Sequence, residues 1–178
     1  MNKFIYILPL REVNLDYFEK LEKDLENKFN FKVRLGNKVE IPDYAYSKDR
    51  NQYNGRIILN ELDNIKIEGA EKILVITEVD LFADDLNFIF GQAESSGKMA
   101  LISTKRLNPE FYKQKKGEDL FYKRIFKEAV HELGHTFGLK HCQNKKCVMH
   151  FSNKVEDTDV KEGVFCVECG KLYEYMKG

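Results

Sequence analysis

The chain has 178 residues, with 29 Lys and Arg against 29 Asp and Glu. This length suffices for one domain with its own core, and the charge balance gives no electrostatic reason to expect a nucleic acid or a membrane as partner. No apolar stretch reaches the roughly 20 residues of a membrane helix. The apolar run FIYILPL (4–10) ends at Arg11 without a small-residue cleavage site, so it predicts a core strand rather than a secretion signal. We expect a cytoplasmic monomer whose partner is a small molecule or a peptide.

The N-terminal third alternates strand and helix patterns. After the FIYILPL strand, apolar side chains recur every three or four positions over residues 15–29 with charges between them, which predicts an amphipathic helix. FKVRLG (31–36) alternates and predicts a second strand. Residues 37–54 are mostly polar and are broken by Pro42, a pattern typical of an exposed connection.

The middle of the chain continues this alternation. Ile58, Leu62 and Ile65 indicate a second helix, and KILVIT (72–77) predicts a central strand buried on both faces. LNFIFGQAE (86–94) and KMALIST (98–104) predict two more strands, and the short SSG connection lets them run antiparallel. These elements predict an α/β (α+β) fold, with a mixed twisted sheet that has one antiparallel edge strand and is covered by helices.

A third helix is predicted from Glu118 to Phe137, where nothing interrupts the helical spacing of apolar residues and Gly138 follows as a plausible C-cap. His131 and His135 are four residues apart, so they lie on one face of this helix and can bind one metal ion. His141 can supply a third nitrogen after the turn at Gly138. Three histidines leave a fourth tetrahedral position open, which distinguishes catalytic from structural zinc.

Glu132 lies between the helical histidines, beside the expected metal, where it can take a proton from water. H-E-x-x-H also arises by chance in helices that bind no metal. The longer pattern H-E-x-x-H-x-x-G-x-x-H, however, resembles the zinc signature of the metzincins, which are zinc peptidases. The resemblance implies a metzincin-like zincin fold, a methionine turn below the zinc supplied by Met149, and an edge strand that pairs with the substrate backbone.

Four cysteines follow the histidines directly, and all lie in the C-terminal part of the chain: Cys142, Cys147, Cys166 and Cys169. Disulfides are rare in chains that lack a secretion signal. CxxC is a common half-site for tetrahedral zinc. We expect a closed structural zinc site. Iron in the same thiolates and a reducible disulfide are the alternatives. His150 is expected to remain solvated or to lie beside the ligands without binding.

The metzincin signature followed by C-x4-C-x-M and a later CxxC resembles the archaemetzincin family over residues 131–169, and VDLFADDLNFIFGQAE (79–94) extends this more loosely. We therefore expect a single metallopeptidase domain over 1–178. Residues 1–138 would hold the sheet and the active-site helix, and 139–178 would form a small zinc-stapled C-terminal subdomain. Two zinc ions per chain are expected, one catalytic and one structural.

The leading functional hypothesis is a zinc-dependent protease (EC 3.4) that hydrolyses peptide or protein substrates with Glu132 as general base. The alternative is a zinc-stabilised binding module with little proteolytic activity, because the sequence shows no clear specificity pocket or oxyanion-stabilising residue. Tyr173 and Tyr175 carry hydroxyls, but packing is their more common role. A nucleic-acid-binding zinc ribbon is disfavoured because KVEDTDVKEG (154–163), between the cysteine pairs, is mixed in charge.

Overall fold

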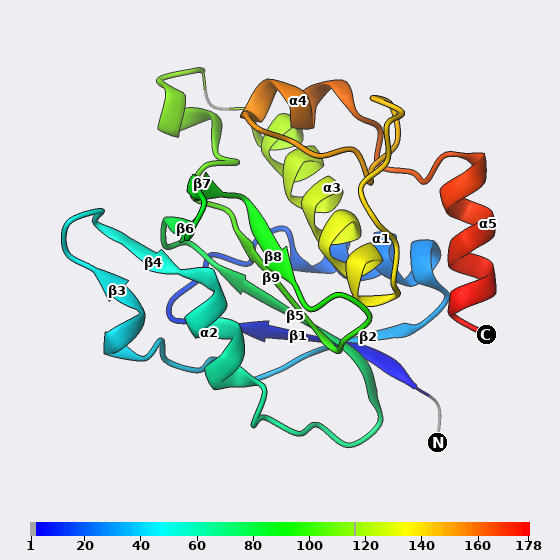
Figure 1. The fold of residues 1–178 in the computed structure, drawn as a ribbon, viewed down its shortest axis with the longest axis horizontal. Coiled ribbons are helices and arrows are strands. Elements are labelled where there is room, and N and C mark those ends of the chain that lie inside the picture. Colours follow the sequence, from blue (N-terminus) through cyan, green and yellow to red (C-terminus); the bar gives the residue numbers. More distant parts are fainter. Residues whose placement is uncertain (1–2, 116) are drawn as a thin grey trace.

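A five-stranded sheet lies at the centre of the computed structural model, which describes residues 3–115 and 117–178 (Figure 1). Its order is β2-β1-β5-β9-β8, and the strands are β1 (Phe4–Pro9), β2 (Lys32–Leu35), β5 (Ala70–Thr77), β8 (Gly91–Ala93) and β9 (Met99–Ser103). The first four strands in this order are parallel, and β8 runs antiparallel to β9 at the edge. The predicted mixed sheet with one antiparallel edge strand is confirmed.

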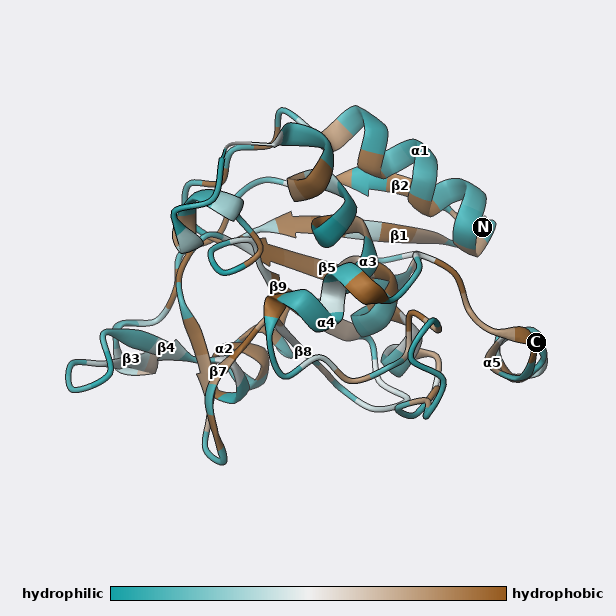
Figure 2. Cartoon of the chain, turned by 90° about the horizontal axis from the view of Figure 1, so that it is seen from above, coloured by the Kyte–Doolittle hydropathy of each residue, from teal (hydrophilic) through white to brown (hydrophobic). Residues whose placement is uncertain are grey.

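Helices cover both faces of this sheet because its central strands are apolar on both sides, as Figure 2 shows for β5 and β9. Leu74 and Ile76 of β5 pack in one core cluster with α1 (Phe18–Phe29) and α3 (Glu118–Thr136). Ile73 and Val75 pack in a second cluster with α2 (Gly55–Leu62). KILVIT is therefore buried on both faces, as predicted. The predicted second helix is shorter than expected: α2 ends at Leu62 and does not reach Ile65.

A smaller sheet of order β3-β4-β6-β7 lies beside the main one. It consists of β3 (Tyr46–Ser47), β4 (Gln52–Asn54), β6 (Leu81–Ala83) and β7 (Leu86–Ile89). The prediction that 37–54 is only an exposed connection is wrong, because this segment holds β3, β4 and a 3-10 helix (Asp43–Ala45). Gln52 is buried through hydrogen bonds to Asp80 and to the carbonyls of Leu81 and Asn87, which no hydrophobic pattern reveals.

The prediction that LNFIFGQAE (86–94) forms one strand is also wrong. The chain leaves the small sheet after Ile89 and joins the main sheet at Gly91, so β7 and β8 belong to different sheets. Phe90 lies at this crossing and is buried in the α1–α3 side of the core. The segment thus bends over the C-terminal half of α3, where the functional site is formed.

The C-terminal part of the chain packs against α3 on the side away from the sheet (Figure 1). Gly138 adopts φ +96°, a left-handed conformation that ends α3 and reverses the chain, as predicted. An irregular segment then leads to α4 (Val155–Val160) and α5 (Val167–Met176), and a second 3-10 helix (Pro109–Tyr112) precedes α3. Within the described ranges, no helix combines the length and the apolar character needed to cross a membrane.

Candidate active site and metal centres

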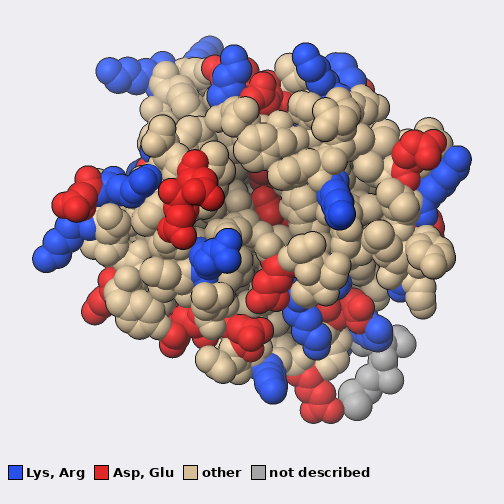
Figure 3. Space-filling view, in the orientation of Figure 1, with Lys and Arg blue, Asp and Glu red and all other residues tan. Residues whose placement is uncertain are grey.

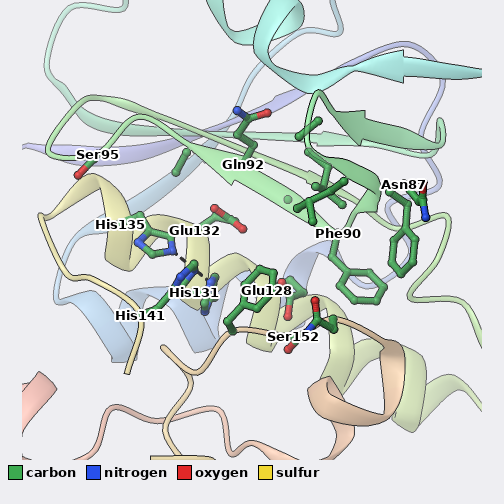
Figure 4. Close-up of a pocket in the computed structure, with 18 residues that line it drawn as sticks. Asn87, Phe90, Gln92, Ser95, Glu128, His131, Glu132, His135, His141 and Ser152 are labelled. Atoms are coloured by element: carbon green, nitrogen blue, oxygen red, sulfur yellow. Dashed lines mark hydrogen bonds between the residues drawn. The ribbon is translucent and has the colours of Figure 1, made fainter. Parts of the chain in front are cut away.

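Three histidines converge at the C-terminal end of α3 (Figure 4). His131 and His135 project from the same face of the helix, and their Nε2 atoms lie 3.1 Å apart. The turn at Gly138 returns His141 to this face, so that its ring centroid lies 5.4 Å from that of His131 and 4.8 Å from that of His135. One nitrogen from each histidine lies within 4.8 Å of the other two, so the three can share one ion.

Backbone carbonyls set the tautomers of the two helical histidines. Nδ1 of His131 donates to the carbonyl of Val148 at 2.7 Å, and Nδ1 of His135 donates to that of Leu139 at 2.7 Å. Because a carbonyl can only accept, each Nδ1 carries the proton and each neutral Nε2 presents a lone pair. Two lone pairs this close repel unless a cation lies between them. Tetrahedral zinc with Zn–N of about 2.0–2.1 Å separates its nitrogens by about 3.3 Å, so the histidines fit zinc.

The surroundings favour neutral imidazoles. Burial lowers the pKa of His131 well below its usual value, and the nearby ammonium of Lys161 lowers it further. Burial is also the main reason that the pKa values of His135 and His141 are lowered. A neutral imidazole is the form that binds a metal, so these histidines need not lose a proton to do so at neutral pH.

Glu132 is buried next to the histidines and faces the edge strand β8. A Cβ atom on Gly91 would lie 2.6 Å from Cγ of Glu132, so the absence of a side chain at Gly91 lets the strand approach this carboxyl group closely. Burial, followed by the charge of Glu128, raises the pKa of Glu132 well above its usual value. A carboxyl group with a raised pKa is suited to exchange protons near neutral pH.

Met149 is fully buried below α3. A Cβ atom on Gly134 would lie 2.5 Å from its sulfur, so Gly134 provides the space that Met149 fills. The carbonyl of Met149 accepts a hydrogen bond from the backbone N–H of Cys142 at 2.9 Å. Met149 therefore lies between the helix that carries the histidines and the segment that carries the cysteines.

The four cysteines form a second cluster, in which every sulfur lies within 4.8 Å of the others. All are free thiols, and Sγ of Cys142 lies 3.8 Å from Sγ of Cys166. Tetrahedral zinc with Zn–S of about 2.3 Å also separates its sulfurs by about 3.8 Å, so this set fits a closed zinc site. The backbone N–H of Cys169 donates to the sulfur of Cys166, and this is the main reason that the pKa of Cys166 is lowered to about 7.

Three side chains considered in the sequence lie outside both clusters. Nδ1 of His150 donates to the carbonyl of Cys142 at 2.8 Å. The hydroxyl of Tyr173 is buried and donates to the carbonyl of Phe29, while Tyr175 is 84% exposed on α5. Neither tyrosine lines the cavity beside the histidines, so the packing role is confirmed for Tyr173.

A cavity of about 430 Å³ opens beside the three histidines. Its walls come from the β7–β8 segment, from α3 and from residues 151–153, and Figure 3 shows it as a hollow with acidic atoms in its depth. The sequence did not point to several of its lining residues: Phe88, Phe90, Glu128, Phe151 and Ser152. Phe88 lies in β7, Phe90 directly follows it, and Glu128 lies one helical turn before Glu132, but their convergence depends on tertiary packing.

Comparison with known proteins assigns the chain to a family. The family model described as peptidase family M54 matches residues 11–174. The archaemetzincin of Methanocaldococcus jannaschii is 44% identical over 167 residues, which cover 94% of this chain and 90% of that protein. The chain belongs to the archaemetzincins, peptidase family M54. It is thus a member of a family of zinc metallopeptidases.

Solved archaemetzincin structures share the fold. The crystal structure of the archaemetzincin of Methanopyrus kandleri superposes with a TM-score of 0.86 at 33% identity and covers 98% of this chain and 96% of that one. A zinc-dependent peptidase from Methanocorpusculum labreanum gives a TM-score of 0.85 at 27% identity, covering 95% and 99% of the two chains. The resemblance found in the sequence is therefore confirmed, for the family and for the fold.

Proposed function

We propose that this archaemetzincin hydrolyses peptide bonds as a metzincin-type zinc peptidase (EC 3.4), with His131, His135 and His141 as the ligands of the catalytic zinc. The observation that carries the proposal is that the Nε2 atoms of His131 and His135 lie 3.1 Å apart. Each Nε2 presents a lone pair, because the Nδ1 of the same ring donates to a backbone carbonyl. The buried carboxyl group of Glu132 lies beside them. When bound, zinc supplies Lewis acidity to the scissile carbonyl and to the attacking water.

The protein groups then have distinct roles. Glu132 takes the proton of the attacking water and delivers it to the leaving amine, for which its raised pKa suits it. The outer edge of β8, which pairs with β9 on its other side, binds the extended substrate backbone through main-chain hydrogen bonds. Gly91 keeps this edge close to Glu132, so that the scissile bond is held next to the proton acceptor.

We also propose that Cys142, Cys147, Cys166 and Cys169 hold a second, structural zinc, so that each chain binds two. This zinc would fix a C-terminal subdomain (139–178) on an N-terminal one (1–138) within one metallopeptidase domain, with Met149 between the two centres. A cytoplasmic monomer that acts on peptides or proteins remains our prediction for location and assembly.

The test is hydrolysis of a mixed peptide library by the zinc-loaded protein, with products identified by mass spectrometry. Glu132→Ala should reduce the rate by about 100-fold or more, because general base catalysis contributes about that much, while zinc content stays unchanged. Glu118→Gln, in the exposed first turn of the same helix, is the control and should keep the wild-type rate. Equal rates for wild type and Glu132→Ala would contradict the proposal. No hydrolysis by either would favour the alternative, a zinc-stabilised binding module.

A further inference from the structure

Glu128 lines the cavity, and within residues 3–115 and 117–178 its contacts with donors are made through one carboxyl oxygen, Oε1. Glu128 lies one helical turn before Glu132 and is 3% exposed. Its Oε1 lies 2.8 Å from Nζ of Lys161 and accepts from the hydroxyl of Thr158 at 3.4 Å. Over residues 3–115 and 117–178, the fully buried side-chain oxygens without a partner belong to Tyr17, Gln92 and Ser152. The contacts of Glu128 in this part of the chain are made through Oε1, so Oε2, which is absent from this set, is not fully buried and faces the cavity that Glu128 lines.

The hydroxyl of Ser152 lies at the same end of this cavity. Figure 4 shows Ser152 and Glu128 together, whereas Ser95 lies at the other end, beyond His135. Oγ of Ser152 is buried and has no hydrogen-bond partner within the described part of the chain. A buried hydroxyl without a partner costs free energy, and a ligand that bonds to it removes that cost.

The charge of Glu128 is already balanced. Lys161 is fully buried, and its ammonium contacts Glu128 and the carbonyl of His150. A cationic side chain entering the cavity would meet a neutral ion pair, with the three histidines and their metal nearby. A neutral hydrogen-bond donor avoids this repulsion and still satisfies the open oxygen of Glu128.

Aromatic rings form the walls of this end of the cavity. Phe88 and Phe90 contact each other edge to face with centroids 5.3 Å apart, and Phe151 packs on His141 at 5.0 Å. The guanidinium of Arg106 lies 4.3 Å from the centre of the Phe88 ring. Two hydrogen bonds to Asp80 fix the guanidinium, which in turn holds the Phe88 ring in place. Such walls favour a flat aromatic ring, because aromatic pairs gain energy beyond the area they bury.

We infer that this part of the cavity selects peptides with a tyrosine next to the scissile bond. The ring lies among Phe88, Phe90 and Phe151, and the phenol donates to Oε2 of Glu128. The hydroxyl of Ser152, which is buried in the unliganded protein, turns about χ1 to donate to the phenol oxygen. This inference rests on the proposed function, and it names the substrate class of that same site.

The first experiment compares matched peptides that carry Tyr, Phe or Lys on either side of one scissile bond. For the zinc-loaded protein, kcat/KM for the Tyr peptide should exceed that for the Phe peptide by about 10-fold, the contribution expected of a hydrogen bond to a charged group. The Lys peptide should be the poorest of the three. Equal rates for Tyr and Phe, or a preference for Lys, would overturn the inference.

The second experiment measures binding and needs no turnover. Calorimetry of zinc-chelating hydroxamates should show tighter binding of the tyrosine than of the phenylalanine hydroxamate, by about the same factor. Glu128→Leu combined with Lys161→Met removes both charges and should abolish this ratio. Ser152→Ala alone should lower it and serves if the double variant does not fold. Ser95→Ala is the matched control and should leave the ratio unchanged.

The outcomes separate the two proposals. A tyrosine preference in binding without hydrolysis of any peptide would overturn the proposed function and support the inference. Hydrolysis without a tyrosine preference would support the proposed function and overturn the inference. A tyrosine preference that survives in both Ser152→Ala and the double variant would also overturn the inference, because its source would lie elsewhere in the cavity.

Discussion

At the scale of single residues, Gly134 decides how closely Met149 can approach α3. A glycine inside a helix costs about 0.5–1 kcal/mol relative to alanine. At this position the cost is offset, because the sulfur of Met149 fills the space where a Cβ atom would lie. The neighbouring carbonyl of Val148 holds His131 in its tautomer, so the packing of Met149 also supports the histidine site.

We predict that Gly134→Ala lowers the free energy of unfolding by about 1–3 kcal/mol, the usual cost of an overpacked core. Gly170→Ala, on α5, is the matched control, because a Cβ atom placed there would meet no atom within 4 Å beyond the adjacent residues and the backbone of the helix. That variant should instead gain about 0.5–1 kcal/mol from helix propensity. Urea denaturation of both variants checks this. A gain in both would show that Met149 moves aside without cost.

At the scale of elements, α4 depends on polar contacts with α3. It has only six residues, too few to be stable alone. Arg124 of α3, which is 1% exposed, forms two hydrogen bonds of 2.7 Å to Asp159, and Lys127 donates to the carbonyl of Thr158. These contacts, together with the Glu128–Lys161 pair, hold α4 on the active-site helix. They also position residues 151–153, which precede α4 and line the cavity.

We predict that Asp159→Ala lowers the free energy of unfolding by about 3 kcal/mol, because it leaves the buried charge of Arg124 without its partner. The figure is at the lower end for a buried pair, since the Asp159 side chain is 33% exposed. Asp119→Ala removes an exposed pair with Lys123 on the same helix and should cause no measurable loss. Chemical denaturation distinguishes the two, and equal effects would argue against a role for α4 contacts.

At the scale of the whole molecule, the histidine cluster and the cysteine cluster are joined by one peptide bond, between His141 and Cys142. The cysteine cluster ties the segment after His141 to the start of α5. This helix packs into the main core through Tyr173, whose ring lies 5.6 Å from that of Phe29 on α1. A disturbance of the cysteine cluster should therefore reach the histidines.

We predict that Cys166→Ser lowers the melting temperature and reduces the zinc content at both clusters, because the metal closes a long loop and contributes folding free energy. Val167→Ser, at the next position and 72% exposed, is the control and should keep both metals. Metal analysis and thermal melting measure the effect. Wild-type zinc content and melting in Cys166→Ser would rule out coupling between the clusters.

The main sheet and α3 could be predicted because their signals are local. The period of apolar residues identified β1, β5 and α3, and the glycine after α3 marked its end. The small sheet could not, because β4 is buried through Gln52 and Asn54, which bond to Asp80 and Asp84 far along the chain. The break in LNFIFGQAE was hidden for a related reason, since both of its halves are strands and only the tertiary fold shows that they join different sheets.

The sequence by itself determined which residues are candidate metal ligands in this archaemetzincin, because histidines four apart share one face of a helix and the two cysteines of CxxC lie close together locally, whereas the two cysteine pairs meet only through the fold. Only the tertiary structure decided what surrounds them. Glu128 and Lys161 look like ordinary solvated charges in the sequence, and each becomes buried only because α4 folds onto α3. The cavity, its open carboxyl oxygen and its aromatic walls likewise arise from segments that meet through long-range packing, which no local pattern records.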